Sequence, residues 1–402
     1  MPQATAPLSR RARELKESAT LAIDALAKAR KAQGKDVVGF GAGEPDFDTP
    51  AFIKDAAKRS LDAGETKYVD PKGILPLRQA IADKLKRDNG LSFAPDQVLV
   101  TCGAKQALYN VLMVAVEEGD EVVLPTPCWV SYPEMVRLAG GTPVLLPTSE
   151  SDGFKVRPEA LRKALTPKTR MILFNSPSNP TGAVQEESEF RALAPILEST
   201  NAWILSDEIY ERLVYGGAKF ASPAALSDGI RARTIVVNGF SKTYAMTGWR
   251  LGYAAGPKDL IAAAGRLQSQ TTSNATSFIQ KAAIEALKSA EPDIRRMVEA
   301  FDRRRKRMVE RLRNIPGVSI VEPKGAFYAF ANVSGLFGKS WNGRRIAGSM
   351  DFAAALLEGA NVAVVPGFPF GSDAHIRLSY ALSNADMEKG LDRIEAFVKG
   401  LG

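Results

Sequence analysis

Short β-rich runs alternate with helical patterns between about Gln97 and Gly256, and this alternation constrains the fold more than any other feature of the chain. Runs such as MILF and WILS are apolar at successive positions, which indicates strands buried on both faces. We therefore predict an α/β protein with a large domain, in which helices flank a mostly parallel sheet. The expected strands are 98–101, 121–125, 143–147, 170–175, 202–207 and 234–238.

The chain after about residue 300 has a different pattern, which predicts a second, smaller α/β domain. A long basic helix comes first, followed by short strands at 318–321, 325–330 and 362–365 and a helix near 351–357. A helix at 19–32 and a strand at 37–38 precede the large domain, and we expect them to pack with this C-terminal unit. The predicted division is residues 1–46 as that N-terminal segment, 47–299 as the large domain and 300–402 as the small domain.

The charge of the chain favours small acidic ligands over a nucleic acid. The 402 residues carry 53 Lys and Arg against 45 Asp and Glu, a formal net charge of +8. The basic residues are scattered, and we interpret their one dense run, 303–307, as the solvated face of a helix. The sequence has a single histidine, His375, which is too few for a His-rich metal site, so we expect no metal.

Cysteine usage and hydropathy favour a cytoplasmic protein without membrane association. Cys102 and Cys128 form no C-x-x-C pair, which suits free thiols in a reducing compartment. No apolar stretch approaches the ~18 residues of a membrane span. The N-terminal stretch lacks a long apolar core, and its acidic residues argue against a secretory signal or a transit peptide.

Polar residues follow several expected strands, at the edge where open α/β sheets bind their ligands. Asp207 ends AWILSD, Asn179 follows MILF, Trp129 follows VVLPTPC and Lys242 follows TIVVNGFS. Taken alone, Lys242 fits a surface lysine and Asp207 fits a helix N-cap. Partial desolvation would instead make the Lys242 amine available as a nucleophile or base.

Several longer segments, taken together, resemble the class I (fold type I) aminotransferases, which use pyridoxal phosphate. The resemblance covers nearly the whole chain and is greatest to the bacterial-type aspartate aminotransferases, some of which also accept prephenate. It adds a cofactor-binding role to the predicted large domain. The matching segments are GAGEPDFDTP, KYVDPKG, VTCGAKQAL, NSPSNPTG, SDEIY, SKTYAMTGWRLGY and HIRLSYA, in this order.

The resemblance implies catalytic and cofactor-binding roles for the strand-end residues. The lysine that matches Lys242 holds pyridoxal phosphate as an aldimine and moves a proton between the substrate Cα and the cofactor. The carboxylate that matches Asp207 keeps the pyridine nitrogen protonated. The residues that match Tyr210 and Asn179 hydrogen-bond the 3′ oxygen of the ring, and the one that matches Trp129 stacks on the ring face.

The resemblance also implies an anion site for the cofactor phosphate. Its backbone part consists of the amides of Gly103, Ala104 and Lys105 at the start of a helix. The side chains that match Ser241 and Arg250 complete this site.

In the family, a tyrosine that matches Tyr68 reaches the phosphate from the neighbouring subunit, so the resemblance implies a homodimer. One position departs from the family pattern. Many aspartate aminotransferases have a serine where this chain has Gly239, so we expect one hydroxyl fewer around the phosphate.

The residues that would bind the substrate α-carboxylate follow from the same resemblance. The arginine that matches Arg377 grips this carboxylate in a bidentate manner, and the Gly43 amide contacts it as well. The residues that match Trp129 and Asn179 also lie beside the substrate in the family.

In the bacterial-type subgroup, a lysine that matches Lys105 contributes to binding the distal carboxylate, and a lysine that matches Lys16 accompanies prephenate use. The sequence therefore predicts transamination between L-aspartate and 2-oxoglutarate, giving oxaloacetate and L-glutamate by a ping-pong mechanism, with prephenate as a further substrate. Two facing cations suit a dicarboxylate, because each charge-assisted hydrogen bond contributes about 1.5–3 kcal/mol.

Three alternatives stay open at this point. An alanine, aromatic or kynurenine aminotransferase would have the same fold, and the pair Lys16 and Lys105 distinguishes the aspartate enzyme from them. A transcription regulator that senses pyridoxal phosphate needs a DNA-binding domain, for which we expect no room ahead of Val37. A nucleic-acid binder that uses the run 303–307 would show a steep salt dependence of its affinity.

Overall fold

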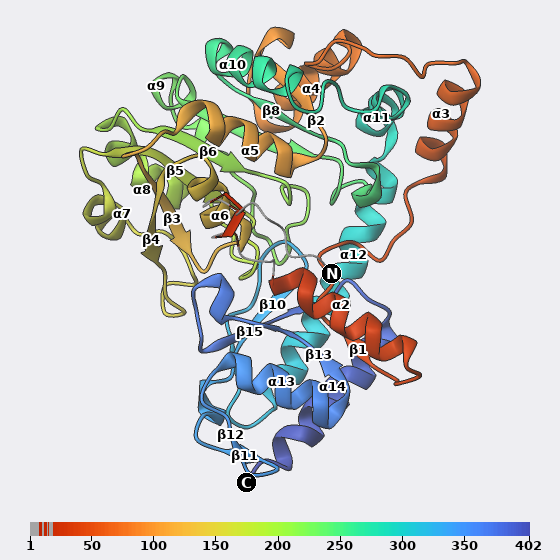
Figure 1. Ribbon diagram of the computed structural model, residues 1–402, viewed down its shortest axis with the longest axis vertical. Helices are drawn as coiled ribbons and strands as arrows, with labels where there is room; N and C mark the ends of the chain where they lie inside the picture. Colours follow the sequence, from red (N-terminus) through yellow and green to blue (C-terminus); the bar gives the residue numbers. More distant parts are fainter. Residues whose placement is uncertain (1–7, 10–11, 14, 16–18) are drawn as a thin grey trace.

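The computed structural model describes residues 8–9, 12–13, 15 and 19–402, and in this part of the chain seven strands form the central sheet. Their order is β2-β8-β7-β6-β5-β3-β4 (Figure 1). All neighbouring pairs are parallel except those of β8, which runs against both β2 and β7. The bounds are β2 Val98–Thr101, β3 Glu121–Thr126, β4 Thr142–Pro147, β5 Thr169–Asn175, β6 Trp203–Asp207, β7 Thr234–Gly239 and β8 Gly252–Ala255.

Both faces of this sheet are buried, as the apolar runs predict. In β5, Met171 and Leu173 belong to an apolar cluster with helix α5 (Ala104–Ala115). Their neighbours Ile172 and Phe174 face the other way and pack with helix α8 (Glu187–Glu198). The alternation of side chains along a strand therefore explains why every position of MILF is apolar.

Further helices surround the central sheet and form the large body of the molecule with it (Figure 1). Helix α11 packs against both α3 and α4. No helix in the described part of the chain is both long and apolar enough to cross a membrane. The bounds are α3 Ala51–Asp62, α4 Leu75–Asn89, α6 Ser131–Leu138, α7 Pro158–Ala164, α9 Asp228–Arg231, α10 Lys258–Ser269 and α11 Ser277–Ser289.

The small body contains a second sheet of the order β14-β15-β10-β9, whose neighbouring strands are antiparallel. The strand expected at 362–365 is in fact two strands, because β13 pairs with β1 and β14 pairs with β15. In the parallel β1–β13 pair, Val38 lies opposite Val362, so an N-terminal strand lies beside a C-terminal one. The bounds are α2 Ala19–Ala32, β1 Val38–Gly39, β9 Ser319–Ile320, β10 Tyr328–Asn332, β11 Ser340–Trp341, β12 Arg344–Arg345, α13 Ser349–Ala360, β13 Val362–Ala363, β14 Val365–Pro366, β15 His375–Ser379 and α14 Asn384–Lys399.

Helix α12 (Glu291–Arg313) contains both the predicted domain boundary and the basic run. It is continuous across residues 299 and 300, so the predicted boundary falls inside one helix. The basic run corrects one expectation, because it is not a uniformly solvated face: the Arg305 side chain is only 1% exposed. Its guanidinium pairs with Asp302 and Glu322, and these carboxylates offset the cost of burying the charge.

Candidate active site

A cavity of about 470 Å³ lies where the carboxyl ends of β5, β6 and β7 meet residues of β10 and β15. Parallel strands present their carboxyl ends at one edge of the sheet, which is where α/β proteins bind ligands. The cavity brings together most of the residues that the sequence singled out. These are Gly43, Ala104, Lys105, Trp129, Asn179, Asp207, Tyr210, Ser241, Lys242, Arg250 and Arg377.

Asp207 is a buried carboxylate at the end of β6, with 4% of its surface exposed. Its Oδ2 accepts a hydrogen bond from the Tyr132 hydroxyl at 2.7 Å, and its Oδ1 accepts one from the Ile209 amide at 3.2 Å. Burial raises the pKa of Asp207 to about 6, and these two hydrogen bonds oppose the shift. The carboxylate is therefore mostly ionised at neutral pH and would attract a positively charged group in the cavity.

Lys242 follows β7, and its ammonium donates a hydrogen bond to the Gly43 carbonyl oxygen. The pKa of Lys242 is lowered to about 8, mainly by burial and also by the nearby Arg250 and Arg377, whereas Glu44 and Asp207 oppose the shift. At neutral pH, the fraction of free amine is thus far larger than for an exposed lysine. Such a lysine can act as a nucleophile or as a base.

Arg377 is a buried guanidinium that forms no ion pair with any carboxylate in the described residues, although it is only 2% exposed. Its Nη1 donates to Asn179 Oδ1 at 2.9 Å and its Nη2 to the Gly41 carbonyl at 2.8 Å. The Nε atom is buried without a hydrogen-bond partner. The Tyr328 ring lies under the guanidinium at 4.4 Å. Because an unpaired buried charge costs several kcal/mol, this arrangement suits an anionic ligand.

The start of α5 and the side chain of Arg250 form an anion cradle. Gly103 precedes the helix with a φ of 86°, and a Cβ there would lie 2.5 Å from Arg250 Nη2. A Cβ at Gly252 of β8 would lie 2.3 Å from the Ala104 amide nitrogen, so only glycine permits this approach of strand and helix. Amides at a helix start and a guanidinium together bind phosphate or carboxylate groups well.

Lys105 and Trp129 form one wall of the cavity. The Lys105 ammonium lies 4.7 Å from the centre of the Trp129 ring. Burial of the amine lowers the pKa of Lys105, and the charge of Arg250 lowers it further. In the part of the chain that the structure describes, Lys105 has no carboxylate partner. It therefore presents a second positive charge to a ligand in the cavity.

Comparison with known proteins identifies the family. Residues 35–394 match the family described as aminotransferase class I and II. The chain belongs to this aminotransferase family. The aspartate/prephenate aminotransferase of Cereibacter sphaeroides is 49% identical over 96% of this chain and 97% of that protein. The aspartate aminotransferase of Geobacillus stearothermophilus is 47% identical over 98% and 99%, respectively.

Solved structures of related proteins confirm the predicted aminotransferase fold. The crystal structure of the aspartate aminotransferase from Rhizobium meliloti has a TM-score of 0.95 at 44% identity, and the match covers 99% of this chain and 100% of that chain. The Thermus thermophilus aspartate aminotransferase with maleate has a TM-score of 0.92 at 43% identity, with 98% and 100% covered.

Two described residues predicted for this aminotransferase lie outside the cavity lining, and a third predicted residue is not described. Gly103 lies directly before the lining residue Ala104. Tyr68, on the segment between α3 and α4, is 89% exposed and is not among the lining residues of this chain's own cavity. Lys16 lies outside the described residues. At Gly239, a Cβ would lie 2.9 Å from the Gly252 Cα, so the serine of many relatives would need a shift of the backbone here.

Sequence reasoning missed several other lining residues of the aminotransferase cavity. Tyr132, the partner of Asp207, lies in α6 three residues after Trp129, and this closeness in the chain could have placed it at the cavity, although not its bond to Asp207. The Thr247 hydroxyl donates to Glu44 Oε2 at 2.7 Å, between segments far apart in the chain. Tyr328 lies on β10, and its hydroxyl is 2.8 Å from that of Tyr210. The Thr247–Glu44 and Tyr328–Tyr210 contacts join segments that are distant in the chain, so no local sequence pattern predicts them.

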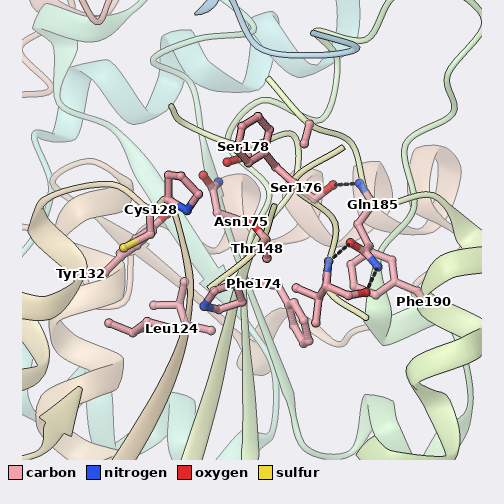
Figure 2. Close-up of a pocket in the computed structure, with 16 residues that line it drawn as sticks. Leu124, Cys128, Tyr132, Thr148, Phe174, Asn175, Ser176, Ser178, Gln185 and Phe190 are labelled. Atoms are coloured by element: carbon pink, nitrogen blue, oxygen red, sulfur yellow. Dashed lines mark hydrogen bonds between the residues drawn. The ribbon is translucent and has the colours of Figure 1, made fainter. Parts of the chain in front are cut away.

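A second, smaller cavity of about 40 Å³ (Figure 2) shares the lining residues Tyr132 and Asn175 with the first. The Gln185 amide nitrogen donates to Ser176 Oγ at 2.9 Å, and the Gln185 side chain bonds the backbone of Val156. Burial raises the pKa of Cys128 to about 12, so its thiol is not a nucleophile at neutral pH. The residues around this cavity therefore hold the active-site wall in place, and we assign no chemistry to the cavity itself.

Proposed function

We propose that this chain transfers the amino group between L-aspartate and 2-oxoglutarate, giving oxaloacetate and L-glutamate by a ping-pong mechanism with pyridoxal phosphate. The observation that carries the proposal is the buried Arg377 guanidinium, which faces the same cavity as Lys242 and lacks a carboxylate partner in the described chain. An α-carboxylate of an amino or oxo acid would supply that partner. The names of the relatives in Cereibacter and Geobacillus support the choice of aspartate.

The residues present fit pyridoxal phosphate. The cradle of helix amides and Arg250 fits its phosphate, and the buried carboxylate of Asp207 fits a protonated ring nitrogen. Lys242 supplies an amine with a lowered pKa near both groups. When bound, this cofactor withdraws electrons from the Cα of an attached amino acid.

Each step that the protein contributes follows from its own side chains. Arg377 binds the α-carboxylate and so orients the Cα–H bond in the cavity. Lys242, as the free amine, would accept the Cα proton of the amino acid and pass it to the cofactor, and in the second half-reaction it would give a proton to the Cα of the oxo acid. Tyr132 holds Asp207 by its hydrogen bond, so that this carboxylate would be available to a protonated ring nitrogen. The Tyr210 hydroxyl would supply a hydrogen bond to the phenolic oxygen of the cofactor.

Lys105 supports a dicarboxylate as the substrate, because its charge has no carboxylate partner in the described residues. A distal carboxylate would neutralise this charge, whereas a neutral side chain would leave it unmatched. Prephenate is a further proposed substrate, supported by the name of the Cereibacter relative. Lys16, the residue that we expect to accompany prephenate use, is not among the described residues.

We also propose that the protein is a homodimer and that it is located in the cytoplasm. Tyr68 is 89% exposed and is therefore free to reach a neighbouring subunit, as the matching tyrosine of the family does. Both thiols are free, which suits a reducing compartment such as the cytoplasm.

The visible spectrum of the purified protein with pyridoxal phosphate tests this function. L-aspartate should bleach the absorbance of the bound cofactor, and 2-oxoglutarate should restore it. Lys242→Ala should bind the cofactor without turnover, because it retains the phosphate cradle but lacks the amine. Bleaching by L-alanine or L-phenylalanine in preference to aspartate would refute the dicarboxylate specificity, and absence of any cofactor band would refute the cofactor.

A further inference from the structure

The single histidine of the chain joins the small body to the large one. His375, 5% exposed at the start of β15, has its Nε2 3.0 Å from Oε1 of Glu150. Glu150 lies in segment 148–157, which connects β4 with α7 and reaches toward the small body (Figure 1). Its Oε2 accepts a hydrogen bond from Asn332 Nδ2 at 2.9 Å. Asn332 is the β10 partner of His375, so one carboxylate binds two paired strands.

The hydrogen bonds of His375 define its protonation. Burial lowers the pKa of His375, with Glu150 opposing the shift, so the ring is neutral at neutral pH. Because the Glu150 carboxylate only accepts, Nε2 must carry the hydrogen. Nδ1 then accepts from the Ser372 hydroxyl at 2.7 Å. Both ring nitrogens are therefore satisfied, and the ring has one orientation.

An aromatic cluster connects His375 with Arg377, which follows it by two residues on the same face of β15. The Phe330 ring stacks on His375 at 4.6 Å, and Phe330 is the β10 partner of Arg377. Phe370 lies 6.2 Å from Phe330 and 5.3 Å from the Arg377 guanidinium. Phe154, from the same large-body segment as Glu150, contacts both His375 and Phe330 edge-on.

The position of Arg377 depends on how β15 lies against the large body. In the described chain, two side-chain hydrogen bonds connect β15 to the large body, namely Arg377 to Asn179 and His375 to Glu150. We propose that the His375–Glu150 pair positions Arg377 and thereby sets the affinity of the site for the carboxylate that all substrates share. This inference rests on the proposed role of Arg377 as the carboxylate-binding residue.

The test compares His375→Phe, which keeps a stacking ring, and Glu150→Ala with the wild type, each saturated with pyridoxal phosphate. Calorimetric titration with maleate, a dicarboxylate that does not react, should show about tenfold weaker binding in both variants, equivalent to ~1.4 kcal/mol. The double variant should lose little more than either single variant, because both remove the same contact. His375→Gln, which can still donate to Glu150, should retain more affinity than His375→Phe.

Steady-state kinetics give the second readout. KM for L-aspartate and for L-alanine should rise by the same factor, with kcat nearly unchanged, because the α-carboxylate is common to both. Asp152→Ala is the matched control, since Asp152 lies in the same segment but bonds Arg157 and Ser149 within the large body. It should leave the affinity for maleate unchanged.

Unchanged maleate affinity in His375→Phe and Glu150→Ala, or an equal loss in Asp152→Ala, would overturn the inference. A wild type that binds no maleate would overturn it as well, because Arg377 would then not be the carboxylate site. A wild type that binds maleate but transfers no amino group would refute the proposed function alone, and the maleate affinities of the variants would still decide this inference.

Discussion

The free-amine fraction of Lys242 sets how fast the apoprotein can capture its proposed cofactor. Because burial lowers the pKa of Lys242 to about 8, protonation blocks attack below that pH, and the rate should rise as the pH passes through about 8. An exposed lysine would respond only near pH ~10.4. Stopped-flow absorbance after mixing with pyridoxal phosphate between pH 6 and 9.5 measures this.

The Glu44 carboxylate provides the control for that profile. It opposes the lowering of the Lys242 pKa, so Glu44→Gln should move the midpoint to lower pH. A flat profile, or a midpoint near that of an exposed lysine, would contradict the burial of the amine.

The charge of Lys105 should determine the preference for dicarboxylate over neutral substrates. Lys105→Ala should reduce the ratio of kcat/KM for L-aspartate to that for L-alanine by about tenfold or more, since a charge-assisted bond of about 1.5–3 kcal/mol is lost. Lys163→Ala, exposed on α7 and outside the cavity lining, should leave the ratio unchanged. An unaltered ratio in Lys105→Ala would assign the distal site elsewhere.

The residues that sequence reasoning brought together are those whose position follows from the strand pattern. Asp207, Asn179 and Lys242 each follow an apolar run, and such residues meet at one edge of the sheet. The bond of Tyr132 to Asp207 and that of Glu150 to His375 depend on how distant segments pack, and no local spacing encodes them. The sequence alone therefore predicted which polar residues line the cavity better than the contacts that support them.

At the scale of elements, the close approach of β8 to the start of α5 shapes the anion cradle. Gly252→Ala would place a Cβ 2.3 Å from the Ala104 amide nitrogen, so the helix start must move. We expect a lower melting temperature, a cost of about 1–3 kcal/mol in stability and weaker binding of pyridoxal phosphate. Thermal melts and equilibrium dialysis measure the two effects.

Gly248→Ala is the matched control, because a Cβ there meets no atom within 4 Å. It should bind the cofactor as the wild type does. Wild-type cofactor affinity in Gly252→Ala would show that the cradle does not hold the phosphate.

The sequence pattern also located most elements of the central sheet to within a residue or two. Strand β2 lies at the expected residues 98–101, because its apolar run and the glycine after it mark both ends. The division of 362–365 into β13 and β14 was not predictable, since it results from pairing with two different strands. Pairing partners are set by tertiary structure, whereas local propensity sets only the existence of a strand.

At the scale of the whole molecule, the proposed homodimer predicts that the exposed Tyr68 of each subunit completes the active site of the other. Tyr68→Ala and Lys242→Ala should each have low activity at limiting pyridoxal phosphate. Mixed dimers should regain activity, because a Lys242→Ala subunit can supply its intact Tyr68 to a partner that retains Lys242. Activity assays after subunit exchange, with light scattering to confirm dimers, measure this complementation.

Mixing each variant with itself under the same exchange conditions is the control and should give no gain. If mixed samples also gain nothing although dimers form, Tyr68 does not contribute to the neighbouring site.

The pairing of β1 with β13 has a consequence for synthesis of the chain. All strands of the central sheet lie between Val98 and Ala255, so the ribosome releases them well before Val362 emerges. The central sheet can therefore fold before β1 pairs with β13. During that interval, the unpaired edge at Val38 is open to mispairing with another nascent chain. A stall in translation shortly before residue 362 would thus yield a finished central sheet while the segment of β1 still lacks its partner strand.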